Sequence, residues 1–191
     1  MERTLELFKE SGALLKGHFL LSSGGHSDGY VQCAKLIMHP EKCQEVAEIM
    51  ASKLTGQSFD LVVGPAMGGI IIAYEVARAL GLPAIFTERV DGRMTLRRGF
   101  QIKPGMKILI VEDVVTTAKS SMESAKVIED LGGEVTALAS IVNRTGGKKI
   151  PLPLYSAIKL DIQTFPAQDC PLCAQNLKLV KPGSRSQKLS L

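Results

Sequence analysis

The sequence predicts an α/β fold in which an open parallel sheet is flanked by helices. Apolar runs at residues 60–64, 83–86, 107–113 and 134–143 alternate with amphipathic helical segments. Continuous apolar runs are typical of strands that are covered on both faces, as in parallel sheets. The chain has 191 residues, 45% of them hydrophobic and 22% charged, which is enough for one domain with a sizeable core.

Two predicted helices precede the sheet. Residues 2–10 form the first. Residues 39–54 form the second, because apolar residues recur on one helical face and Pro40 stands at the start, where its missing N–H costs nothing. Both are expected to pack an apolar face on the domain.

The strands and crossover helices follow in alternation. Glycine ends each predicted crossover helix, at Gly81 and at Gly132, as is common at a helix C-terminus. The expected order is strand 60–64, helix 68–81, strand 83–86, strand 107–113, helix 120–133, strand 134–143 and a further strand within 155–165. The α/β core is therefore expected over residues 40–165.

Composition narrows the range of partners. The net charge is +4, Trp is absent, and only 5% of residues are aromatic. A basic stripe with interleaved aromatics, typical of nucleic-acid binding, is missing. Neither a leader nor an apolar run long enough to span a bilayer stands in the sequence. We expect a cytoplasmic protein that binds a small anionic ligand, with no nucleic-acid or membrane partner.

The cysteines and histidines carry weaker signals. Cys170 and Cys173 have the spacing of half a zinc site, but a structural zinc site needs four ligands and no second pair stands nearby in the sequence. We therefore expect reduced thiols in a C-terminal turn. His18 and His26 are expected to be surface or hydrogen-bonding residues, and neither is assigned as a catalytic base.

Every predicted strand ends in glycine, charge or hydroxyl residues. The segments are GPAMGGI, TERVDGRMTLRRGF, EDVVTTAKS and NRTGG, in chain order. Ligands of open parallel sheets bind beyond the carboxyl ends of the strands. This edge of the sheet is therefore the expected binding site.

The third of these segments is the most informative. A loop that turns directly into a helix presents free N–H groups and the positive end of the helix dipole, which together bind phosphate. Glu112 and Asp113 would repel that phosphate unless they hold ribose hydroxyls or a divalent metal. The pattern indicates a sugar phosphate. The alternative to a sugar-phosphate site is that both acids are solvated residues at the strand end and that Ser120 only caps the helix.

The segment ILIVEDVVTT resembles the phosphoribosyl-pyrophosphate signature of type I phosphoribosyltransferases. The upstream GPAMGG resembles their pyrophosphate loop, and residues 89–101 stand where the family has a mobile hood. Residues 17–32, GHFLLSSGGHSDGYVQ, and the segment VNRTGG are similar to those of orotate phosphoribosyltransferases. The resemblance covers nearly the whole chain.

The resemblance implies transfer of 5-phosphoribosyl from phosphoribosyl pyrophosphate to orotate in UMP synthesis, with Mg²⁺ as cofactor, in a homodimer. It implies residues 1–39 as an N-terminal helix and base-binding segment, 40–165 as the core and 166–191 as a tail. The implied catalytic residues are Asp113, Glu112 and Arg89, with Asp113 at the metal and Thr116, Arg144, Ser23 and Gly24 at orotate. The implied donor-binding residues are Glu112, Asp113, Val114, Val115, Thr116, Thr117, Ala118, Lys119, Ser120, Met67, Gly68, Gly69 and Arg93.

Two departures from the family leave alternatives open. Ala118 and Lys119 stand where many members have glycine. The turn is expected in right-handed helical space, although Lys119 could instead supply a cation, or phosphate binding could be impaired. The hood contains arginines but neither lysine nor histidine. A phosphoribosyltransferase for another base, or a non-catalytic regulator that binds the donor, are the alternative functions.

Overall fold

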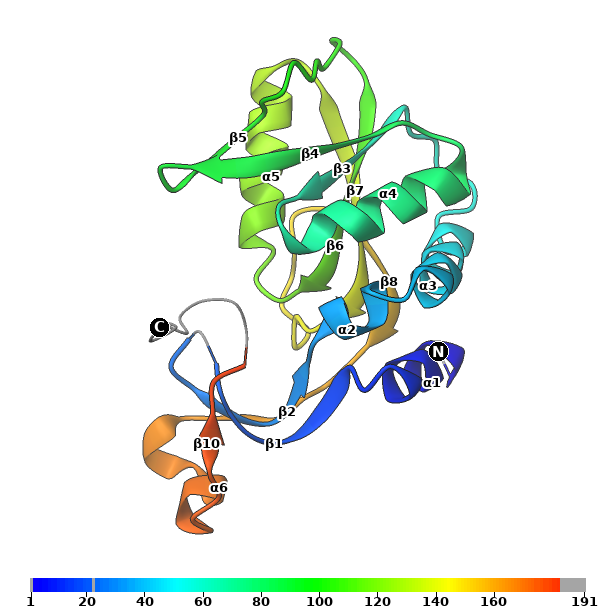
Figure 1. The fold of residues 1–191 in the computed structure, drawn as a ribbon. Helices are drawn as coiled ribbons and strands as arrows, with labels where there is room; N and C mark the ends of the chain where they lie inside the picture. The colour runs from blue at the N-terminus through cyan, green and yellow to red at the C-terminus, as the bar shows by residue number, and fades with distance from the viewer. Residues whose placement is uncertain (1, 22, 183–191) are drawn as a thin grey trace, which may run out of the picture.

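A computed structural model describes residues 2–21 and 23–182 of the chain. Its larger sheet has six strands in the order β5-β4-β3-β6-β7-β8 (Figure 1). The strands are β3 (Leu61–Pro65), β4 (Ala84–Val90), β5 (Arg93–Thr95), β6 (Lys107–Val115), β7 (Glu134–Asn143) and β8 (Leu154–Lys159). All neighbours pair in parallel except β4 and β5, which form an antiparallel hairpin.

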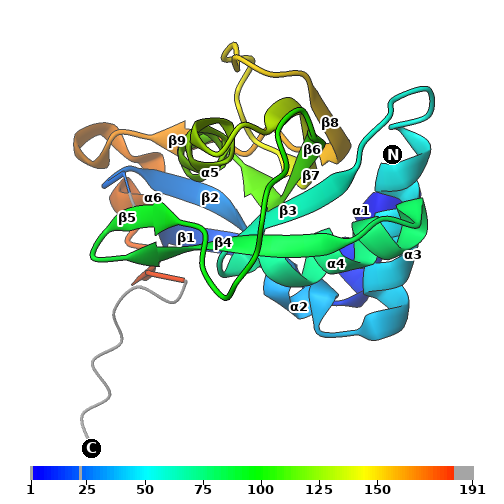
Figure 2. The same cartoon turned by 90° about the horizontal axis from the view of Figure 1, so that it is seen from above.

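Helices cover both faces of this sheet. Figure 2 shows α3 (Pro40–Ser52) and α4 (Gly68–Leu80) on one face and α5 (Lys119–Asp130) on the other. Strand β6 packs against both layers, because Leu109 and Val111 point into one buried cluster while Ile108 and Ile110 point into the other. The prediction of an open parallel sheet between helices is confirmed.

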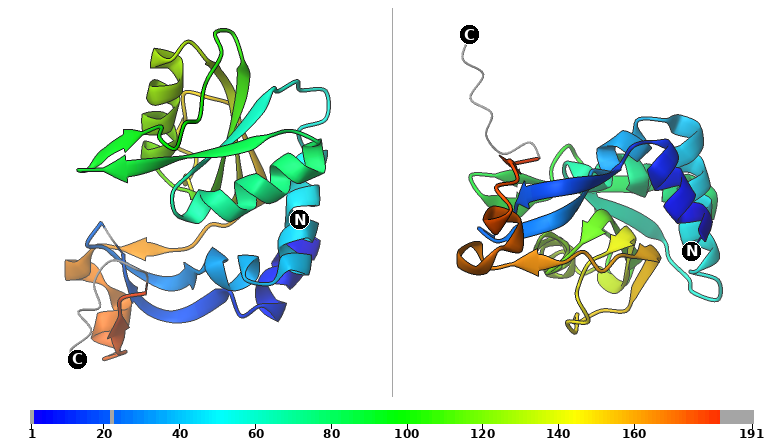
Figure 3. Two further views of the ribbon diagram at one scale, coloured as in Figure 1. Left: turned by 45° about the horizontal axis from the view of Figure 1, so that its top comes forward. Right: turned by 90° about the horizontal axis from the view of Figure 1, so that it is seen from below.

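A smaller sheet lies beyond the core and has the order β10-β1-β2-β9. It joins the hairpin of β1 (Leu14–Leu20) and β2 (His26–Val31) to β9 (Thr164–Phe165) and β10 (Leu179–Val180) near the other end of the chain. Figure 3 shows the C-terminal segment, with α6 (Pro171–Ala174), beside the N-terminal hairpin. The sequence did not predict these strands. The division at residues 39/40 and 165/166 stays a prediction, and residues 183–191 of the proposed tail lie outside the described part.

The remaining elements are short. Helix α1 (Glu2–Glu10) packs on α3, α2 (Cys33–Ile37) connects the hairpin to α3, and a 3₁₀ turn spans Ala167–Asp169. Among the described residues, none of the helices combines the length and the apolar character that crossing a membrane requires.

The sheet order brings two loops together. Strands β3 and β6 are neighbours, with Val63 opposite Ile110. The loop after β3 therefore begins beside Glu112 and Asp113, although about 50 residues separate them in the sequence. This pairing sets the geometry of the candidate site.

Candidate functional site

The carboxylates of Glu112 and Asp113 lie against the glycines that begin α4. A Cβ atom built on Gly68 would stand 2.8 Å from Oδ1 of Asp113, and one on Gly69 would stand 3.3 Å from Oε2 of Glu112. The Gly69 Cβ would also meet the carbonyl oxygen of Val111 at 2.8 Å. Glycine is therefore required at both positions for the loop to approach the carboxylates this closely.

Burial raises the pKa of both carboxyl groups. The pKa of Glu112 rises from 4.5 to about 8, because the side chain is desolvated and Asp113 adds a like charge. The pKa of Asp113 also rises through burial, although the N–H of Val114 donates to its Oδ1 at 2.8 Å and opposes the rise. Two carboxylates in such a place favour hydroxyl donors or a hard cation as ligands.

The loop between β6 and α5 forms a hollow of about 90 Å³. Its lining residues are Glu112, Val114, Thr116, Thr117, Ala118, Lys119, Ser120 and Ser121. The first turn of α5 opens onto this hollow, so hydroxyl groups and helix N–H groups face the same space. The arrangement suits a phosphate group.

The expectation for the turn at Ala118 is wrong. Ala118 lies in left-handed space, with φ 56° and ψ 17°, where an L-residue is less stable by roughly 1–2 kcal/mol. Its methyl group is buried among Val115, Ala125 and other apolar residues, and that packing offsets part of the cost. Lys119 begins α5 in helical conformation with an exposed side chain, as expected.

A second part of the site surrounds Arg144, which follows β7. The thiol of Cys33 donates to the carbonyl oxygen of Asp113 at 3.7 Å. The backbone N–H of Arg144 donates to the carbonyl oxygen of Val115 at 2.8 Å. Burial lowers the pKa of the Arg144 guanidinium, which lies near Tyr30. No carboxylate of the described residues pairs with Arg144, so this half-buried cation can take an anionic ligand.

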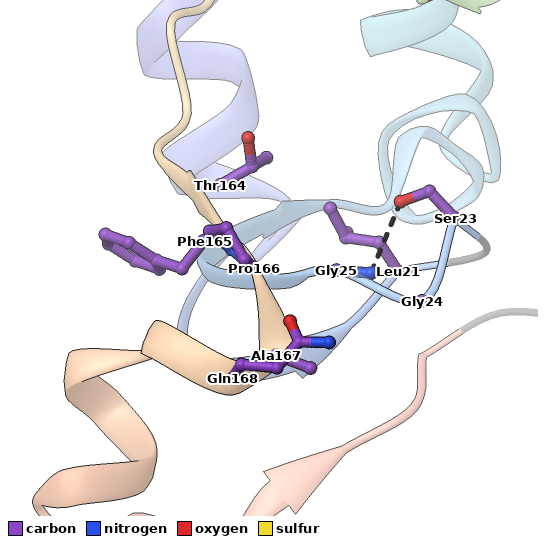
Figure 4. Close-up of a pocket in the computed structure, with 9 residues that line it drawn as sticks. All are labelled: Leu21, Ser23, Gly24, Gly25, Thr164, Phe165, Pro166, Ala167 and Gln168. Atoms are coloured by element: carbon purple, nitrogen blue, oxygen red, sulfur yellow. Dashed lines mark hydrogen bonds between the residues drawn. The ribbon is translucent and has the colours of Figure 1, made fainter.

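The N-terminal residues predicted at orotate line a hollow of their own. Ser23 and Gly24 line a hollow of about 590 Å³ with Leu21, Gly25 and residues 164–168 (Figure 4), and neither Thr116 nor Arg144 lines it. Tyr30 lies four residues after His26 in β2. At about 3.3 Å per residue, this places Tyr30 roughly 13 Å along the strand from His26. The structure brings Tyr30 of β2 near Arg144.

Tyr30 was missing from the predicted site. Burial and the charge of Asp113 raise the pKa of its phenol, and the charge of Arg144 opposes this rise. The signal in the sequence was the tyrosine within the segment GHFLLSSGGHSDGYVQ, but nothing local showed which of its residues reach the core.

The arginines of the predicted hood lie on the β4–β5 hairpin and the loop after it. Arg89 pairs with Glu123 of α5 and donates to the carbonyl oxygen of Gly92 at 3.0 Å. Arg97 and Arg98 both pair with Glu88. Arg93 is exposed and pairs with no carboxylate of the described residues. The hairpin projects from the edge of the sheet (Figure 1).

Comparison with known proteins decides the family. Residues 35–169 match the profile of the phosphoribosyl transferase domain. The chain belongs to the phosphoribosyltransferase family. It is 49% identical over 185 residues to the orotate phosphoribosyltransferase of Caldanaerobacter subterraneus subsp. tengcongensis, covering 96% of this chain and 97% of that protein.

Solved structures of phosphoribosyltransferases have the same fold. The orotate phosphoribosyltransferase of Aeropyrum pernix superposes with a TM-score of 0.67 at 25% identity, covering 81% of this chain and 92% of that one. The orotate phosphoribosyltransferase of Mycobacterium tuberculosis, in complex with inorganic phosphate, superposes with a TM-score of 0.67 at 24% identity. The match covers 84% of this chain and 97% of that one. The predicted resemblance, fold and transferase class are confirmed.

Glu112 makes the ligand-free protein sensitive to pH. Its pKa is about 8 when folded and 4.5 ordinarily, so the folded state holds the extra proton between these values and stability falls as pH rises through them. Without divalent cations, Glu112→Gln should therefore raise the melting temperature at pH ~9 by about 3–6 °C, with little effect at pH ~5. Differential scanning calorimetry measures both.

Glu134→Gln is the matched control, because Glu134 is exposed at the start of β7. It should leave the melting temperature nearly unchanged. An equal shift for Glu112→Gln at the two pH values would contradict a buried, protonated Glu112.

Proposed function

We propose that the protein transfers 5-phosphoribosyl from phosphoribosyl pyrophosphate to N1 of orotate, giving orotidine 5′-monophosphate and pyrophosphate for UMP synthesis. The observation that carries this proposal is the approach of Gly68 and Gly69 to Glu112 and Asp113, beside a loop that suits phosphate. The full-length relative named for this reaction supports orotate as the base. The cytoplasmic location stays a prediction.

The reaction breaks one bond and forms one. The C1′–O bond of the donor breaks, and the electron pair leaves with pyrophosphate. Orotate N1 forms the new bond to C1′, and its proton goes to solvent. Positive charge develops on the ribose and negative charge on the leaving group, so positioning and electrostatic stabilisation are the main tasks of the protein.

The residues of the sheet edge divide these tasks. The backbone of Met67, Gly68 and Gly69 would hold the pyrophosphate, because no side chain separates it from the carboxylates. Glu112 and Asp113 would hold the ribose hydroxyls. The hydroxyl groups of Thr116, Thr117 and Ser120, with the first N–H groups of α5, would hold the 5′-phosphate, and Val114 to Lys119 supply the backbone of that loop.

Mg²⁺ fits the same carboxylates. Their oxygens are the ligands that Mg²⁺ prefers, and their raised pKa values indicate a place where a cation would stabilise the ionised forms. Asp113 would hold the ion, which would neutralise charge on the diphosphate.

Arg144 is the proposed partner of the orotate carboxylate. Its guanidinium is half-buried, unpaired among the described residues and close to Tyr30, which could pack against a planar base. Thr116 lies one residue beyond Val115, which binds the backbone of Arg144, so its hydroxyl can share the contact with the base. Ser23 and Gly24 stay predictions.

A homodimer is proposed as the active form. Met67, Ile71 and Tyr74 are apolar, largely exposed and spaced to lie on one face of α4, with Met67 85% and Tyr74 64% exposed. A second copy would cover this face, and the projecting β4–β5 hairpin would carry Arg89 and Arg93 toward the neighbouring site. In that arrangement the hood arginines would contact pyrophosphate across the interface.

Sedimentation velocity tests the dimer. Tyr74→Glu should shift the protein from dimer to monomer, because a charge would replace apolar area at the centre of the interface. Leu131→Glu is the control, since Leu131 is exposed at the end of α5 on the opposite layer. A wild-type monomer, or dissociation by the control alone, would rule out this interface.

A base panel tests the reaction. With phosphoribosyl pyrophosphate and Mg²⁺, orotate should be consumed and uracil, adenine and hypoxanthine should not. Arg144→Ala should lower kcat/KM for orotate about a hundredfold, with little change in donor binding. Arg3→Ala, an exposed arginine of α1 that pairs with Glu6 and Glu45, should be unaffected. Preference for another base, or donor binding without turnover of any base, would establish one of the alternative functions.

A further inference from the structure

Four side chains of ligand type meet away from the sheet edge. His18 and His26 come from the β1–β2 hairpin, and Cys170 and Cys173 come from the C-terminal segment. One ligand atom from each lies within 4.8 Å of all the others. This is the only such group among residues 2–21 and 23–182.

The distances match a tetrahedral ion. Nε2 of His18 and Nδ1 of His26 are 2.9 Å apart. Nε2 of His18 lies 3.5 Å from Sγ of Cys170 and 3.8 Å from Sγ of Cys173, and Nδ1 of His26 lies 3.3 Å from Sγ of Cys173. Around Zn²⁺ with ordinary bond lengths, tetrahedral ligands are separated by about 3.3 Å (N to N) and about 3.6 Å (N to S). The four atoms thus surround a space of the right size.

Local structure positions each ligand. Antiparallel pairing sets Leu20 opposite His26, and His18 lies two residues before Leu20 in β1, so both histidines face the same side. Cys170 caps α6 and Cys173 follows three residues later, so both thiols lie on one side of this turn.

A hydrogen bond fixes the imidazole of His18. Its Nδ1 lies 2.8 Å from the carbonyl oxygen of Leu177. A carbonyl can only accept, so Nδ1 carries the proton and Nε2 presents its lone pair to the group. Ligating histidines in metal sites are oriented by such a bond from the other ring nitrogen.

We propose that His18, His26, Cys170 and Cys173 bind a structural Zn²⁺ ion. Thiolate and imidazole ligands select zinc over Mg²⁺ or Ca²⁺. Four protein ligands close the coordination shell, which is typical of structural sites, whereas catalytic sites keep a position for water. His18, His26 and Cys170 are only 3%, 6% and 5% exposed, so the ion would be shielded from solvent.

The ion would join two ends of the chain. Strands β9 and β10 have two residues each, so few backbone hydrogen bonds hold the C-terminal segment to the hairpin. The hairpin tip and residues 164–168 also form the hollow in Figure 4, so the same ion would hold both walls of that hollow. The sequence suggested only half a site, because His18 and Cys170 are 152 residues apart.

Metal analysis of the purified full-length protein tests this proposal. Inductively coupled plasma mass spectrometry should find about one zinc per chain in wild type. His26→Ala and Cys173→Ala should lose most of it. His39→Ala and Cys43→Ala are matched controls, since neither residue belongs to the group, and they should retain the zinc.

A second measurement does not depend on the variants folding. Wild type, stripped by a chelator under reducing conditions and refilled with Co²⁺, should show the absorption of tetrahedral cobalt bound to thiolate. The stripped protein should melt at a lower temperature, and Zn²⁺ but not Mg²⁺ should restore it. Wild type that carries no zinc and gives no thiolate–cobalt absorption would overturn the proposal, as would a disulfide joining Cys170 and Cys173 in the freshly purified protein.

Discussion

The site depends on one close approach, between the glycine backbone after β3 and the carboxylates after β6. Parallel pairing of these strands sets Val63 opposite Ile110. Beyond this pair, the two segments lead to Gly68 and Asp113, which lie against each other. A Cβ atom on Gly68 would meet the carboxylate of Asp113, and one on Gly69 would meet the carbonyl oxygen of Val111. Burial and the neighbouring Asp113 raise the pKa of Glu112, so a hydroxyl donor or a cation at this place would stabilise its ionised form.

Local patterns predicted the parts of the molecule that depend on local sequence. The helical face of residues 39–54 and the apolar run ending in Glu112 and Asp113 placed the core elements within a few residues of their observed bounds. The conformation of Ala118 escaped prediction, because a left-handed alanine is retained only through the packing of its methyl group among residues distant in sequence. Tyr30 escaped for the same reason, since β2 had to be placed before its neighbours were known.

The pairing of the strands in the small sheet could not be predicted from the sequence. Its strands come from residues 14–31 and from 164–180, and no periodic pattern connects them. The spacing of the two cysteines suggested half a zinc site, but the two histidines join them only in the folded structure. The sheet contains both Tyr30, proposed to pack against the base, and the proposed zinc site, so the two proposals concern the same small sheet.

The affinity of Gly68→Ala for phosphoribosyl pyrophosphate, measured by isothermal titration calorimetry with Mg²⁺, tests the central claim most directly. The added methyl group meets only the end of the Asp113 side chain, so the fold should persist. Displacement of that carboxylate and of the pyrophosphate should weaken binding at least tenfold, about 1.4 kcal/mol. Unchanged affinity in a folded variant would show that the donor does not lie between the glycine loop and Asp113.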